Sequence, residues 1–157
     1  EKFAYTSALI STGKSFRQKY GIFKAKIKFS PSAVSQAFWM VSDSVTPHIN
    51  IAGFEKGKLF ADLFWSGGTA GSMMKSSSKT GGSKYSSGYF IFSLEWAPGK
   101  LIWKINDKVF KVQTQGVPEE EMYISFSANL KEGASDAGLP SSMEVDWVRV
   151  YKLAEEK

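Results

Sequence analysis

Apolar and polar residues alternate with a period of two along most of the chain, which is the spacing of side chains on a β-strand. The clearest case is residues 22–29, where Phe23, Ala25, Ile27 and Phe29 alternate with lysines. Sustained helical periodicity is absent from the sequence, and the extended segments are separated by turns rich in Gly, Pro and Ser. This pattern predicts an all-β fold, either a sandwich or a barrel.

We expect strands at about 5–11, 21–29, 36–42, 48–54, 58–65, 89–96, 101–105, 108–114, 122–128 and 143–152. The pair Asn106-Asp107 predicts a two-residue hairpin turn between two of these strands. The last strand is apolar on both faces apart from three charged residues, so we expect it to be covered on both sides. The segment Ser66–Gly88 is rich in Ser, Gly and Lys and is unusually long for a connection. It is interpreted either as a functional or mobile loop or as a disordered insertion.

Composition limits the possible functions. The 157 residues suffice for one domain, residues 1–157, and 43% hydrophobic with 15% aromatic residues is typical of a globular protein. The absence of cysteine excludes disulfides and thiolate metal sites, and a single histidine argues against a zinc centre. No apolar run approaches the roughly 20 residues that span a bilayer. Because the chain begins with Glu1 and not with Met, we expect a processed or trimmed segment.

The formal net charge of +5 suits an anionic partner but does not identify one. Lys24, Lys26 and Lys28 form a stripe on one strand face, which could bind a sulfated or carboxylated glycan. The alternative, which we favour, is an ordinary solvated face. A clustered basic and aromatic surface of a known nucleic-acid-binding type is missing from the sequence, so nucleic acid is not an expected partner.

Several short blocks of sequence occur in the order of one known family. They are Tyr5-Thr6-Ser7, residues 20–28, Ala37-Phe38-Trp39-Met40, Leu94-Glu95-Trp96, residues 105–108 and residues 145–151. The chain thus resembles the family 16 glycoside hydrolases, which include laminarinases, lichenases and agarases. This resemblance implies a concanavalin A-like jelly-roll sandwich of two antiparallel sheets. It also implies a polysaccharide or oligosaccharide as partner, a secreted or cell-surface location, and no required cofactor.

The resemblance also locates the catalytic positions. In that family a strand following A-F-W-M carries E-I-D-I-x-E, with the nucleophile, a helper aspartate and the acid/base. In this chain those positions are His48, Asn50 and Gly53, so all three carboxyl groups are expected to be missing. Retaining hydrolysis requires two carboxyl groups about 5–5.5 Å apart. Glu55 is expected to point to the same face of the strand as Gly53, but we identify no second carboxylate near it on that face. A glycosidase with displaced carboxylates is therefore the least favoured function.

Two functions remain open: a non-catalytic carbohydrate-binding domain, and a structural or protein-interaction sandwich that binds no glycan. The candidate carbohydrate-binding residues are His48, Asn50, Trp65, Tyr85, Trp39, Ser125 and Ser127. His48 and Asn50 can hydrogen-bond sugar hydroxyls, and Trp65 and Tyr85 could stack on a sugar ring. Trp39 is expected to lie in the core, because buried aromatic residues dominate such interiors. A tryptophan that stacks on sugar in the family is replaced here by Ser35, which favours the interaction domain.

The resemblance suggests a calcium ion on the convex side of the sandwich. Many relatives bind calcium through the aspartate of the final V-D-x-V-R-V-Y strand, here Asp146, and carboxylate oxygens suit this hard cation. We therefore expect EDTA to lower the melting temperature and added calcium to restore it. A melting temperature that neither EDTA nor calcium changes would contradict this prediction.

Overall fold

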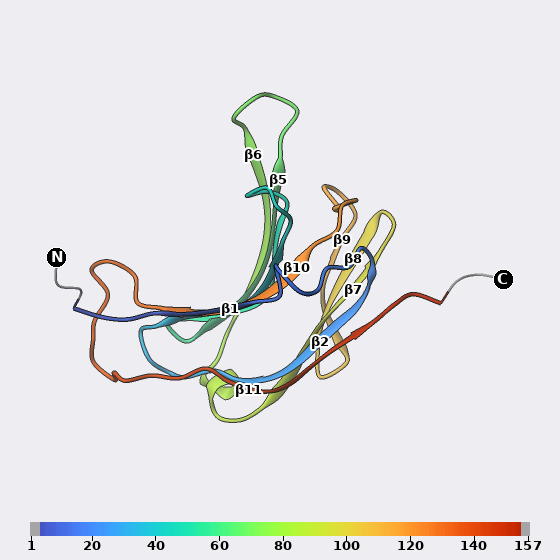
Figure 1. Cartoon of the computed structure of the whole chain (residues 1–157). Coiled ribbons are helices and arrows are strands. Elements are labelled where there is room, and N and C mark those ends of the chain that lie inside the picture. The colour runs from blue at the N-terminus through green and yellow to red at the C-terminus, as the bar shows by residue number, and fades with distance from the viewer. Residues whose placement is uncertain (1–3, 155–157) are drawn as a thin grey trace.

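The computed structural model describes residues 4–154. Two antiparallel sheets pack face to face (Figure 1), with strand orders β1-β10-β3-β4-β5-β6 and β11-β2-β7-β8-β9. The first sheet consists of β1 (Ala8–Ser11), β3 (Ser35–Val41), β4 (His48–Glu55), β5 (Lys58–Ser66), β6 (Met73–Gly81) and β10 (Tyr123–Asn129). The second consists of β2 (Gly21–Lys28), β7 (Phe90–Ala97), β8 (Lys100–Ile105), β9 (Lys108–Gln113) and β11 (Glu144–Tyr151). The predicted all-β jelly-roll sandwich is confirmed.

The core lies between the two sheets and follows the alternation of the strands. On β2, Phe23, Ala25 and Ile27 are fully buried, while the lysines between them reach the outer surface. Aromatic rings connect the sheets: Phe29 stacks on Phe54 with ring centroids 5.4 Å apart. Burial of such apolar surface is the main contribution to stability in a fold of this kind. Within residues 4–154, no helix is long and apolar enough to cross a membrane.

Two tight turns depend on left-handed backbone conformations. Asn106 and Asp107 have φ of 47° and 63°, as a two-residue hairpin between β8 and β9 requires, so the predicted hairpin is confirmed. Lys56 and Gly57, with φ of 49° and 71°, join β4 to β5 in the same way. This second turn was not predicted, because lysine seldom adopts positive φ.

The prediction of a loop over Ser66–Gly88 is wrong. The segment contains the nine-residue strand β6, which pairs with β5 along its whole length, followed by the short 3-10 helix η1 (Ser83–Ser86). An edge strand needs backbone pairing on one side only, so its side chains can be polar on both faces and give no apolar alternation. From the opposite sheet, Lys111 Nζ donates hydrogen bonds to the backbone oxygens of Ser76 on β6 and Ala61 on β5.

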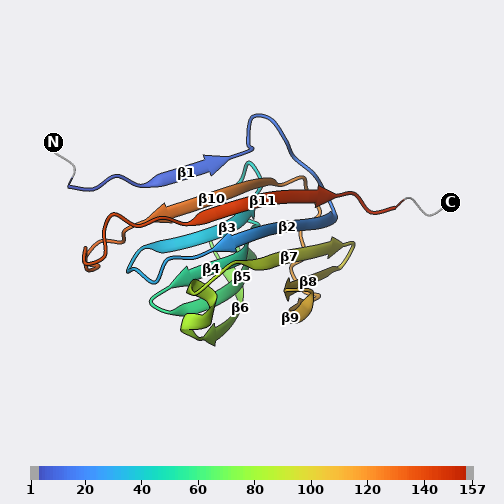
Figure 2. The same ribbon diagram turned by 90° about the horizontal axis from the view of Figure 1, so that it is seen from below.

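The prediction that the last strand is covered on both sides is also wrong. β11 is an edge strand, and Val145, Val148 and Tyr151 are 38–46% exposed. Figure 2 shows β11 along the same side of the sandwich as β1, the edge strand of the other sheet, where Ile10 is also largely exposed. The sandwich is therefore open along this side, and apolar residues at an open edge remain accessible to solvent.

Gly116, in the connection between β9 and β10, provides a test of the packing around Trp65. Its φ is +67°, and a Cβ at this position would overlap the indole of Trp65. Gly99 has a similar φ of +69° but open space around its missing Cβ. We expect Gly99→Ala to lower the free energy of unfolding by about 1 kcal/mol through backbone strain alone. Gly116→Ala should cost about 1–3 kcal/mol more, because the ring must move. Urea denaturation measures both, and equal losses for the two variants would contradict this account.

Candidate functional site

The outer face of the six-stranded sheet is concave, because its strands curve together along their length (Figure 1), and it holds a groove of about 520 Å³. The groove is lined from β3, β4, β5, β6 and neighbouring turns. Its residues are Ser35, Ala37, Asn50, Glu55, Lys56, Lys58, Phe60, Asp62, Phe64, Lys75, Lys79 and Lys131. The groove therefore combines aromatic rings, polar groups and many charges.

A β-bulge in β4 brings His48, Asn50 and Gly53, the positions that the family resemblance assigns to catalytic carboxyl groups, onto this face. The register between β4 and β5 shifts between Asn50 and Gly53, and both Ile51 and Ala52 are buried in the core. Because two successive residues point inward, Asn50 and Gly53 both point outward although they are three residues apart. His48, two residues before Asn50, lies on the same face. At Gly53, a Cβ would overlap the ring of Phe60, which lines the groove.

The bulge leaves a backbone carbonyl directed into the core. The indole Nε1 of Trp103, a buried residue of β8 in the opposite sheet, donates a hydrogen bond of 3.0 Å to the carbonyl oxygen of Asn50. A buried carbonyl without a partner would cost about 1–3 kcal/mol. Trp103 therefore stabilises the irregular backbone that places Asn50 in the groove.

On the groove side, a chain of hydrogen bonds fixes the polar side chains. The Asn50 side chain donates through Nδ2 to Asp62 Oδ2 at 3.2 Å, so its Oδ1 faces His48 Nε2 at 3.0 Å. The His48 ring therefore carries its proton on Nε2 and donates it to Asn50. Asp62 is 4% exposed and also accepts a hydrogen bond from Ser77. Three side chains thus form one connected network around a buried carboxylate.

Trp39 lies beside this network and not in the core. Its ring stacks on the imidazole of His48 with centroids 4.9 Å apart, and its Nε1 donates to Ser127 Oγ at 3.0 Å. The expectation of a core position is therefore wrong: Phe38 and Met40 are the buried residues of β3, so Trp39 points to the opposite face. Its role as a sugar contact remains a prediction.

The other candidate residues divide between the two faces of the sheet. Ser127 is half-buried near the groove, and Ser125 pairs with Trp39 across the strands but is fully buried. Trp65 packs against Gly116 and the core, on the face of β5 away from the groove. Tyr85 is 7% exposed within the core cluster. The prediction that Trp65 and Tyr85 stack on a sugar in the groove is therefore corrected, because strand parity and the short helix η1 direct both inward.

A second carboxylate, which the sequence analysis missed, lies on the concave face. Asp62 pairs across the strands with Asn50, and Glu55 pairs with Lys58 at the other end of the groove. Lys58 and Asp62 are four residues apart on β5, so the two carboxylate-bearing positions are separated by about 13 Å. Glu55 forms an ion pair of 2.6 Å with Lys131. Asp62 could have been found from its parity with Phe60 and Phe64, but apolar neighbours on both faces of β5 hid that signal.

The lysine stripe on the convex face is paired with carboxylates. Lys24, Lys26 and Lys28 form ion pairs with Asp107, Asp146 and Glu144 at 3.1, 2.7 and 3.1 Å, as expected for a solvated face. Asp146, the candidate calcium ligand, is thus paired with Lys26. In the described part of the chain, no three His, Asp or Glu residues are grouped as a metal would require. Calcium binding at Asp146 remains a prediction.

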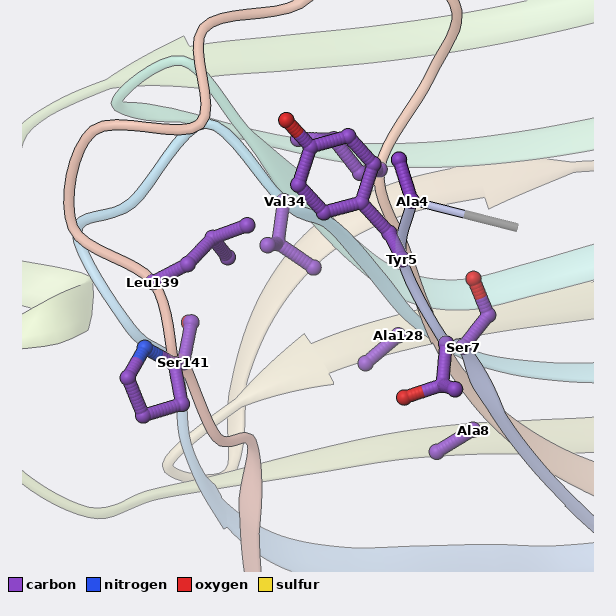
Figure 3. Close-up of a pocket in the computed structure, with 11 residues that line it drawn as sticks. Ala4, Tyr5, Ser7, Ala8, Val34, Ala128, Leu139 and Ser141 are labelled. Atoms are coloured by element: carbon purple, nitrogen blue, oxygen red, sulfur yellow. The ribbon is translucent and has the colours of Figure 1, made fainter. Parts of the chain in front are cut away.

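A second hollow, of about 570 Å³, lies where the N-terminal segment meets the loop before β11. Figure 3 shows the side chains of Tyr5, Val34 and Leu139 around it. Its lining consists of small, apolar and hydroxyl-bearing residues, without a charged side chain among the described residues. The concave groove, with its fixed polar network, is therefore the better candidate for a functional site.

Comparison with known proteins agrees with this fold. The family model of glycosyl hydrolases family 16 matches residues 2–149. The chain belongs to this family. A curated relative, the endo-1,3-1,4-beta-glycanase ExsH of Rhizobium meliloti (strain 1021), is 21% identical over 165 residues, which cover 96% of this chain. The family 16 domain described here spans only 34% of the length of ExsH.

Solved structures of family members share the fold. The laminarinase from Rhodothermus marinus superposes with a TM-score of 0.81 and 17% identity, over 99% of this chain and 75% of that one. The kappa-carrageenase from Pseudoalteromonas carrageenovora, in complex with an oligotetrasaccharide of kappa-carrageenan, gives a TM-score of 0.74 and 17% identity, over 90% and 66%. A Bacteroides ovatus family 16 protein in complex with a glucan product superposes with a TM-score of 0.73 and 19% identity, over 91% of this chain and 74% of that one.

The environment of His48 predicts an unusual titration. Burial lowers the pKa of His48, although the hydrogen bond to Asn50 and the charge of Asp62 oppose this effect. The pKa in the folded state thus lies below the unfolded value of about 6.5, and the unfolded chain binds more protons between the two values. We expect the stability of the wild type, relative to His48→Gln, to fall as pH decreases through this interval.

His48 is the only histidine, so its imidazole proton resonances report its pKa directly by NMR. The His48→Gln variant keeps a donor for Asn50 and does not titrate, which makes it a suitable control in urea denaturation at each pH. A titration midpoint at or above 6.5 would contradict the prediction.

Proposed function

We propose that this family 16 domain, expected as one unit over residues 1–157, binds a polysaccharide or oligosaccharide in its concave groove without cleaving it. The observation that carries the proposal is the separation of the two groove carboxylates. Glu55 and Asp62 lie about 13 Å apart along the strands. Retaining hydrolysis needs about 5–5.5 Å between its carboxyl groups and inverting hydrolysis about 6.5–9.5 Å. Neither mechanism fits this spacing.

The former catalytic positions offer no substitute for these carboxylates. Asn50 has no ionisable proton, Gly53 has no side chain, and the ring of Phe60 occupies the space that a side chain at position 53 would need. His48 is held by Asn50 through the nitrogen that carries its proton. General acid catalysis requires a proton donor free to reach the leaving oxygen. The groove therefore has groups that can contact a sugar chain, but it lacks an acid that can protonate the leaving oxygen of a glycosidic bond.

The same groups suit sugar binding. Phe60 and Phe64 are half-buried in the groove and present apolar surface for a sugar ring. Trp39 stacks on His48, whose ring in turn makes an edge contact with Phe64. The network of His48, Asn50 and Asp62 fixes polar atoms at the centre, so they lose little freedom on binding. Relatives solved as oligosaccharide complexes include a kappa-carrageenase and a Bacteroides ovatus family 16 protein. A role in polysaccharide binding also accords with a secreted or cell-surface location.

A structural or protein-interaction role is the second candidate function. It is favoured by the serine at position 35, where the family resemblance implies a tryptophan that stacks on sugar, and by the inward position of Trp65. Fewer stacking platforms mean weaker sugar binding. The two functions therefore differ in whether any glycan binds at all.

Titration calorimetry with oligosaccharides of laminarin, lichenan, agarose and xyloglucan tests the proposal. We expect dissociation constants between about 1 μM and 1 mM, or roughly −8 to −4 kcal/mol. The His48→Ala/Asn50→Ala double variant should bind at least about tenfold more weakly, because it loses two polar contacts. The Lys28→Ala/Glu144→Ala variant removes an ion pair from the convex face and should bind like the wild type.

Absence of binding to every glycan, or binding unchanged in the His48→Ala/Asn50→Ala variant, would favour the interaction domain. Incubation with the same polysaccharides should release no reducing ends above a heat-inactivated control. Turnover that disappears in Glu55→Gln would instead identify a displaced active site.

A further inference from the structure

The concave groove carries a surplus of positive charge. Five lysines line it, Lys56, Lys58, Lys75, Lys79 and Lys131, against the two carboxylates Glu55 and Asp62. The groove thus has a net charge of +3, more than half of the +5 of the whole chain. Positive charge concentrated in a concave surface attracts anions more strongly than the same charge spread over a convex surface.

The lysines of the convex face behave differently. Lys24, Lys26 and Lys28 each form an ion pair with a carboxylate. In the groove, Lys131 is paired with Glu55, and Lys75 lies 3.9 Å from Asp62. Lys56, Lys58 and Lys79 take part in none of the ion pairs found within residues 4–154. Their charge is therefore available to a ligand.

Two of the lysines stand directly opposite aromatic rings on the neighbouring strand. Across the β5–β6 ladder, Lys79 pairs with Phe60 and Lys75 with Phe64. The ammonium group of Lys75 lies over the ring of Phe64, 4.7 Å from its centroid. Each phenylalanine therefore has a cation beside it on the neighbouring strand. A sugar ring stacked on the apolar surface would place its ring substituents next to that cation.

We propose that the ligand of the groove is an anionic polysaccharide, whose sulfate or carboxylate groups bind these lysines while its sugar rings contact Phe60 and Phe64. This inference rests on the proposed function and adds the chemical class of the ligand. The charge-assisted contacts compensate for the tryptophans that the groove lacks, since a hydrogen bond to an ionised group is about twice as strong as a neutral one. Asp62 does not oppose the ligand, because Asn50, Ser77 and Lys75 surround it.

Affinity electrophoresis and titration calorimetry with three defined polysaccharides test the proposal: sulfated kappa-carrageenan, carboxylated alginate and neutral laminarin. We expect at least one of the anionic polymers to bind about tenfold or more tightly than laminarin, and its affinity to fall about tenfold between 50 and 300 mM NaCl. The comparison between kappa-carrageenan and alginate distinguishes sulfate from carboxylate recognition. A double-stranded DNA of 20 base pairs serves as a polyanion without the sugar chemistry of a glycan.

Two charge-matched double variants locate the contact. Lys58→Gln/Lys79→Gln removes two groove lysines outside the ion pairs of the described residues, and should weaken anionic binding about tenfold. Lys24→Gln/Lys28→Gln removes the same charge from the convex face and should leave binding within about twofold of the wild type.

Each other result decides against the inference. Laminarin binding as tight as that of both anionic polymers, without salt dependence, would overturn it while leaving the proposed function intact. Equal loss in both lysine variants, or DNA bound as tightly as the anionic glycans, would show non-specific attraction. No binding to any of the three polysaccharides would overturn this inference. It would refute the proposed function as well only if the oligosaccharides of lichenan, agarose and xyloglucan also failed to bind.

Discussion

The groove depends on one hydrogen bond that crosses the sandwich, from the indole of Trp103 to the backbone carbonyl of Asn50. The bulge in β4 is what allows residues three positions apart to face the same groove, and its cost is a carbonyl removed from the regular ladder. Trp103, fixed in the core of the opposite sheet, satisfies that carbonyl. The polar surface of the groove is thus supported from beneath by an apolar residue of the other layer.

Lys111 supports the adjacent strands in a similar way. It projects from β9 into the interior, donates hydrogen bonds to backbone oxygens of β5 and β6, and lies 4.7 Å from the centroid of the Trp103 ring. Burial lowers the pKa of Lys111 to about 8. The edge strand β6, which has a neighbour on one side only, is thereby tied to the body of the sandwich. Lys75 and Lys79 therefore stand on an anchored strand, which is what a binding surface requires.

The sequence predicted the fold well where burial on one face imposes alternation, and poorly where it does not. β2 is the clearest prediction, because Phe23, Ala25 and Ile27 face the core and the residues between them face water. β6 was missed because an edge strand with serines on both faces, and lysines on one of them, gives no alternation of apolar and polar residues. The order of the family motifs supplied what periodicity could not, namely the sandwich topology; its assignment of catalytic positions to His48, Asn50 and Gly53 remains a prediction.

The site was harder to predict, because the sequence gives the identity of an aromatic residue but not the face of the sheet to which its side chain points. Trp39 was placed in the core and lies beside the groove, whereas Trp65 was placed in the groove and packs on Gly116. Strand parity decides both cases, once the buried neighbours Phe38 and Leu63 are known. Asp62 was not predicted as a site residue, because its neighbours in the sequence are apolar. Its significance comes from Asn50 and Ser77, which reach it from neighbouring strands and are distant in sequence.

The contact between Gly53 and Phe60 couples two neighbouring positions of the concave face. A Cβ at position 53 would overlap the phenyl ring of Phe60, so the ring fills the space next to the glycine. A single Gly53→Glu substitution would meet that ring, and a smaller residue at position 60 alone would only open a cavity over the glycine. Either change on its own is unfavourable, so the residues at these two paired positions of β4 and β5 constrain each other.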